Sequence, residues 1–177
     1  SKPVYDNAQT FEFKNNSSVL SCTENSNKFR TCCWNLIIKR KFLFDNKIFF
    51  RKIETAEDRV FVSEILCLLK NFYLIKKPIY IHRDFHLNTL SKIQGYDRAK
   101  SLLNVVSAIL KFVKNKKPFL NKKKIEYLLK VINFSTQELF LDLIICDKQN
   151  LKNLSLLIFK LKLKNELSVL SEYRIKY

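Results

Sequence analysis

The sequence predicts an α/β fold, with a mixed part up to about residue 96 and an all-helical part beyond it. Before that point, short runs of aromatic and β-branched residues alternate with one segment that has an apolar helical stripe. From Asp97 onward, apolar residues recur at helical spacing. The 177 residues, 47% of them hydrophobic, suffice for one globular domain with a core. We therefore expect two regions, 1–96 and 97–177, of different architecture.

The first fifty residues predict only short elements. The pieces TFEFK and SSVLSC favour strands and lie among polar loops. The following stretch, CCWNLIIKRKFLFDNKIFF, carries aromatic and branched residues in bursts, and Asp45 with Asn46 gives a turn signal. It predicts a short helix, a turn and a strand.

The stretch ETAEDRVFVSEILCLLKNF, residues 54–72, predicts an amphipathic helix. An apolar stripe runs along it from Val60 to Leu69. Thr55 and Asp58 have the spacing of a capping box, in which both side chains pair with amide groups at the helix start. Acids there also suit the positive pole of the helix dipole. The same acids have a second interpretation, a catalytic carboxylate, and the two interpretations are compatible.

The elements after residue 72 follow from the same rules. FYLIKKPIYIHRD predicts a strand pair or a bent strand, with Pro78 at an edge or a bend because it cannot donate a ladder hydrogen bond. DRAKSLLNVVSAILKFVKN and NKKKIEYLLKVIN predict two helices separated near Pro118. STQELFLDLIIC predicts a new helix start through a capping box from Ser135 to Glu138. A lysine-rich helix is predicted for about residues 150–173.

The formal net charge of +17 and the scarcity of glycine limit the functions. Such a charge suits a phosphate backbone, anionic lipid headgroups or a nucleotide-sugar diphosphate. Gly95 is the only glycine, which excludes glycine-rich phosphate loops. The five cysteines are odd in number and lack paired Cys-x-x-Cys spacing, so we expect reduced thiols and no structural zinc. Since neither a signal peptide nor an apolar stretch of about 20 residues is visible, we expect a cytoplasmic protein.

Four segments form an ordered series: CWNLIIKRKFL, ETAEDRVF, KKPIYIHRD and NTLS. With the phenylalanines between the first two, the matching residues are Trp34, Asn35, Leu36, Lys39, Arg40, Phe42, Leu43, Phe49, Phe50, Glu57, Asp58, Phe61, Pro78, Ile79, Tyr80, Arg83, Asn88, Thr89 and Ser91. This series resembles the second half of the bacterial family 2 glycosyltransferases, the inverting GT-A enzymes that build capsules and lipooligosaccharides. The resemblance covers about residues 30–92.

The resemblance implies that residues 1–96 are the acceptor-side, C-terminal half of a Rossmann-like GT-A fold, followed by a basic helical tail at 97–177. It implies an inverting hexosyltransferase that moves a hexose or N-acetylhexosamine from a nucleotide sugar to a glycan or lipid-linked glycan. The family's nucleotide-binding half and its Asp-x-Asp motif for Mn²⁺ or Mg²⁺ have no counterpart here. We therefore expect a fragment, with the main ligands of that metal outside this chain.

By resemblance, Asp58 is the general base that deprotonates the attacking hydroxyl, and Glu57 orients the base or the acceptor. We expect the helix start to keep Asp58 ionised at some cost to its basicity. Trp34, the only tryptophan, has two interpretations: a core residue, or an aromatic face at the rim of the acceptor site.

Three further residues are candidates for substrate binding. Arg59 and Arg83 can hold a diphosphate or an acidic acceptor by bidentate hydrogen bonds, although solvated arginines are the common case. His82 stands where the family often has an aromatic residue. A lone histidine without carboxylate partners is more often structural than a metal ligand, so no metal ligand is assigned.

The alternative function is a basic helical module that binds nucleic acid or a membrane surface without catalysis. Nucleic acid is disfavoured because no recognised motif is present and the basic residues are spread along the chain. The segments KNKKPFLNKKK and KLKLKNE mix lysine with apolar residues, and basic amphipathic helices bind anionic membranes. We therefore expect an anionic membrane surface as a partner, no nucleic acid, and peripheral attachment at the inner face of the membrane.

Overall fold

The computed structural model describes residues 11–15, 31–75, 81 and 93–161. Most of these residues are helical, and their only strands are β1 (Phe11–Asn15) and β2 (Asn71–Ile75). β1 lies where TFEFK predicts a strand, and β2 covers the start of the predicted strand stretch FYLIKKPIYIHRD, most of which lies outside the described residues. The two strands pair antiparallel, with Phe11 opposite Ile75. An α/β fold needs parallel strands joined by helices, and the described residues contain no parallel pair. The α/β, Rossmann-like GT-A fold expected from the sequence is therefore wrong.

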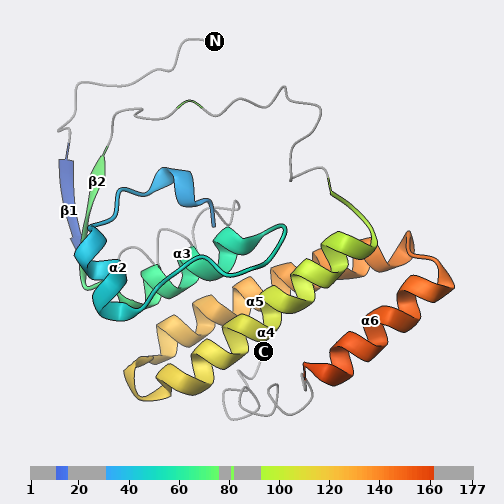
Figure 1. The fold of residues 1–177 in the computed structure, drawn as a ribbon. Coiled ribbons are helices and arrows are strands. Elements are labelled where there is room, and N and C mark those ends of the chain that lie inside the picture. The colour runs from blue at the N-terminus through green and yellow to red at the C-terminus, as the bar shows by residue number, and fades with distance from the viewer. Residues whose placement is uncertain (1–10, 16–30, 76–80, 82–92, 162–177) are drawn as a thin grey trace.

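Helices of very different length make up the rest of the described chain. They are η1 (Cys33–Asn35), α2 (Arg40–Asn46), α3 (Glu57–Leu68), α4 (Tyr96–Lys116), η3 (Lys117–Phe119), α5 (Lys122–Ile144) and α6 (Lys148–Lys160). Figure 1 shows α4 and α5 as a long hairpin, with α3 and α6 beside it. Within the described residues, no helix combines the length and the apolar character needed to cross a bilayer.

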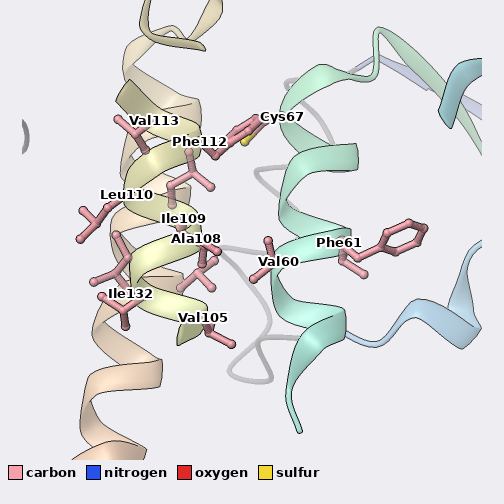
Figure 2. Packing of buried hydrophobic residues seen from close by; sticks show 14 of the residues in the cluster. Val60, Phe61, Cys67, Val105, Ala108, Ile109, Leu110, Phe112, Val113 and Ile132 are labelled. Carbon is pink, nitrogen blue, oxygen red and sulfur yellow. The ribbon is translucent and has the colours of Figure 1, made fainter. Parts of the chain in front are cut away.

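The core lies where α3 packs against the hairpin of α4 and α5. Val60 and Cys67 on α3 and Val105 on α4 are fully buried. Figure 2 shows Val60 facing α4, and Cys67 close to Phe112 near the other end of the contact. Full burial of one such apolar side chain contributes about 1.5–3 kcal/mol. This core joins residues on both sides of the boundary expected between the two regions.

The segment between α2 and α3 covers α3 without forming a strand. Lys47 adopts a left-handed conformation, with φ 55°, and ends α2. Ile48 is buried, and Phe50 stacks on Phe61 with the ring centroids 4.1 Å apart. Figure 2 shows Phe61 on the side of α3 that faces away from α4. The strand predicted here is wrong: Phe50 packs against a helix, and the only sheet among the described residues is the β1–β2 pair.

The helices predicted beyond residue 96 are confirmed, except at one boundary. α4 covers the whole segment predicted for it, and α6 packs against α4. α5 continues without a break through Ser135 and Glu138, so the capping box predicted there is wrong. The true start of α5 is capped by Asn121, whose side-chain oxygen accepts a hydrogen bond from the Lys124 amide at 3.0 Å. The part of the predicted helix that follows Leu161 lies outside the described residues.

Candidate functional site

The start of α3 places both predicted catalytic acids side by side. Glu57 and Asp58 are the first two helical residues, and Ala56 precedes them in a left-handed conformation with φ 61°. No side chain caps this helix, and the Arg59 amide donates to the Ala56 carbonyl at 3.1 Å. Thr55 is one residue too early to cap and is buried instead. The capping box predicted for Thr55 and Asp58 is therefore wrong.

The carboxyl group of Asp58 holds its proton more firmly than an ordinary aspartic acid. Burial raises its pKa above the usual 3.8, and the neighbouring charge of Glu57 raises it further. The charge of Arg59 and hydrogen bonds from backbone amides lower the pKa, but by less. The helix start was expected to reduce the basicity of Asp58. The net shift is in the opposite direction, so Asp58 is a better proton acceptor than expected.

The short helix η1 brings Trp34 to the same end of α3. η1 packs against α3, and Figure 1 shows it as the blue turn near the start of that helix. The pKa of Cys33 is raised mainly by burial and then by the negative charges of Asp58 and Glu57, which places that thiol within electrostatic reach of both acids. Trp34, the next residue, is 38% exposed. It is therefore not a fully buried core residue.

Arg59 turns away from these acids and reaches across to α5. Its guanidinium donates to Glu138 Oε2 at 2.5 Å and to Ser135 Oγ at 3.2 Å. The same group lies over the ring of Phe134, 4.8 Å from its centroid. Only 11% of the Arg59 side chain is exposed. In this conformation it binds α5, and its assignment to a diphosphate or an acidic acceptor stays a prediction.

Arg98 on α4 extends this contact into a network between three helices. It binds Glu138 Oε2 at 2.9 Å and lies 3.7 Å from Asp142 Oδ2. The other oxygen of Asp142 accepts the amide of Gly95, at the start of α4, at 3.0 Å. We call Arg59, Arg98, Ser135, Glu138 and Asp142 the inter-helix network.

Sequence reasoning missed the inter-helix network. Its one visible signal was the Ser135 to Glu138 spacing, which also puts both side chains on one face of a continuous helix. Two other predicted site residues, His82 and Arg83, lie outside the described residues. In the described part of the chain, no cluster of three or more histidine, cysteine, aspartate or glutamate side chains could hold a metal ion.

Comparisons with known proteins do not assign this chain to a family. No protein-family model matches the chain. Searches among curated proteins and among solved structures also found no match.

Proposed function

We propose that the start of α3 is the acceptor side of an inverting glycosyl-transfer site, with Asp58 as the general base. The observation that carries the proposal is a carboxyl group of raised pKa on the same end of α3 as a partly exposed tryptophan. A base accepts a proton best when its pKa approaches the working pH. The Rossmann-like fold is not part of this proposal, which rests on local chemistry and on the resemblance of residues 30–92.

In the proposed step, the acceptor hydroxyl attacks the anomeric carbon of a nucleotide sugar while Asp58 takes its proton. The bond between that carbon and the nucleoside diphosphate breaks, and the diphosphate leaves with the bonding electrons. Burial, and then the charge of Glu57, keep the pKa of Asp58 raised. Trp34 offers a ring face to the acceptor sugar. The resemblance puts the nucleotide site and its Mn²⁺ or Mg²⁺ outside this chain. The proposal therefore covers only the acceptor site, which would hold the glycan or lipid-linked glycan that receives a hexose or N-acetylhexosamine.

The sole tryptophan provides a direct test. Its emission is recorded while the protein is titrated with neutral oligosaccharides. Transfer is assayed with UDP-hexoses, UDP-N-acetylhexosamines and Mn²⁺ in a complete enzyme that contains this acceptor half. We expect the sugars to change the emission of Trp34, and any turnover to fall about 10²- to 10⁴-fold in Asp58→Asn. Asp45→Asn is the matched control because Asp45 is exposed and, among the described residues, pairs with Lys41 alone. The proposal fails if no sugar changes the emission and no transfer depends on Asp58.

A second proposal concerns location. We propose that the protein lies in the cytoplasm, attached peripherally to the anionic inner face of a membrane. The net charge of +17 supports it, since each lysine near such a surface contributes about 1 kcal/mol. This attachment needs no catalysis and would also suit a purely membrane-binding module. Sedimentation with anionic vesicles tests it, and absence of binding near physiological salt would contradict it.

A further inference from the structure

The turn between α4 and α5 carries a cluster of lysines around an exposed aromatic ring. Phe119 in η3 is 69% exposed, whereas the next residue, Leu120, is buried and anchors the turn. Residues 114–124, which we call the basic tip, contain no acidic residue and six lysines: Lys114, Lys116, Lys117, Lys122, Lys123 and Lys124. Figure 1 shows this turn, in yellow, at one end of the hairpin.

Three of these lysines stand where helix electrostatics disfavour them. Lys122, Lys123 and Lys124 form the first turn of α5, which has no acidic residue. The N-terminal end of a helix is the positive pole of its dipole, so cations there are repelled. The next acid along α5, Glu126, approaches Lys122 only to 3.9 Å. The helix itself gains little from this charge, and an anion outside the tip would relieve the repulsion.

We propose that the basic tip docks on an anionic lipid surface, with Phe119 inserted among the headgroups and the lysines beside lipid phosphates. Aromatic rings are favoured at the interface between headgroups and hydrocarbon, and lysines add attraction to anionic lipids. The proposal specifies which surface of the protein makes the membrane contact proposed above, and it rests on that contact. It does not depend on glycosyl transfer.

Charge argues against the other partners for this surface. A second copy of the chain would bring another +17, so self-association through the basic tip would set like charges against each other. A nucleic acid would also attract lysine, but arginine has the planar fork that binds phosphates and bases bidentately, and the basic tip contains no arginine. Lipid headgroups form a diffuse anionic layer that requires no fixed fork geometry.

The charge of the basic tip is tested by sedimentation of the full chain with phosphatidylcholine vesicles, with and without phosphatidylglycerol. The double variant Lys122→Gln/Lys123→Gln should bind the anionic vesicles roughly 30-fold more weakly than the parent. The matched control is Lys148→Gln/Lys152→Gln, which removes the same charge from exposed positions on α6. We expect a much smaller effect there, and no vesicle binding without phosphatidylglycerol.

The contribution of the Phe119 ring is tested separately. Phe119→Ala should weaken binding to anionic vesicles roughly tenfold, whereas Phe159→Ala, at a phenylalanine on α6 that is 82% exposed, should not. Since both rings lie outside the core, the melting temperature should stay unchanged and show that the variants are folded.

The outcomes separate this proposal from the one on which it rests. If the parent binds anionic vesicles and the tip and control variants lose affinity equally, membrane attachment stands but the basic tip is not the docking surface. If the parent does not bind at all, both proposals fail. The basic tip would be a nucleic-acid or self-association surface if its variants lost affinity for duplex RNA, or lost a dimer in sedimentation velocity, while vesicle binding stayed unchanged.

Discussion

A half-buried carboxylate at the start of α3 carries a cost in stability that depends on pH. Because the folded pKa of Asp58 lies above the usual 3.8, the folded state keeps the proton over a range of pH in which the unfolded chain has lost it. Stability therefore falls as pH rises from about 3.8 through the folded pKa, and the cost is complete once the pH lies above the folded pKa. Below both pKa values the cost is absent.

This direction of the pH dependence of stability gives a prediction for Asp58→Asn. Relative to the parent, the variant should gain free energy of unfolding between acidic and neutral pH, because asparagine carries no charge to desolvate. Urea unfolding of both proteins at a series of pH values measures the difference. If the variant instead lost stability relative to the parent as pH rose, the carboxylate would be stabilising the helix start, as the capping interpretation predicts.

Gly95 illustrates a backbone requirement at a single residue. Its φ of +69° is rarely adopted by residues with a side chain, whereas a Cβ there would make only ordinary contact with Ile145, at 3.7 Å. Gly95→Ala should therefore cost about 1–3 kcal/mol of stability through strain, as measured by urea unfolding. Adding Ile145→Ala should not restore the loss. Restoration would show that crowding, and not the backbone, demands glycine.

Among the elements, α5 depends on the inter-helix network for its contact with α3. Glu138→Ala would leave the guanidinium groups of Arg59 and Arg98, both mostly buried, without their shared acid. We expect a loss of about 2 kcal/mol or more in free energy of unfolding, measured by urea titration. The control on the same helix is Glu126→Ala, whose pair with Lys122 spans 3.9 Å and should contribute less than about 1 kcal/mol. Equal losses would contradict a structural role for the network.

The elements also show what could be read from the sequence. α4 was predictable because its apolar period is local and uninterrupted. The Ser135 to Glu138 spacing was misleading because it occurs both in capping boxes and within one face of a helix. The two cases are distinguished only in the folded chain, where α5 is continuous and Arg59 binds both side chains. At the candidate site, the acids and the tryptophan could be proposed, but the raised pKa of Asp58 could not, since it depends on burial that appears only after packing.

The whole molecule differs from its expected fold because strand pairing is not local information. Aromatic and branched residues between α2 and α3 have strand-like composition, yet Phe50 stacks on Phe61 and the segment covers a helix. Within the described residues, Cys33, Cys67 and Cys146 carry free thiols, and the expectation of reduced thiols for the whole chain stays a prediction.

The net charge of +17 leads to a prediction about salt. Self-repulsion destabilises a compact chain of high net charge, and added salt screens it. The melting temperature should therefore rise when sodium chloride is added to a low-salt buffer, and potassium chloride should act equally. A fall with salt would mean that attractive ion pairs such as Lys41–Asp45 outweigh the repulsion.

The pairing of β1 with β2 has a consequence for the order of folding. These strands come from distant parts of the chain, so their contact must close a long loop, whereas the α4–α5 hairpin forms between neighbours. A lone pair of strands is also marginally stable in water. We expect the hairpin to form early and β1 to join last. In native-state hydrogen exchange, the amides of Asn71–Ile75 should then open at much lower free energy than those of α4, so that β1 can detach while the helical core stays intact.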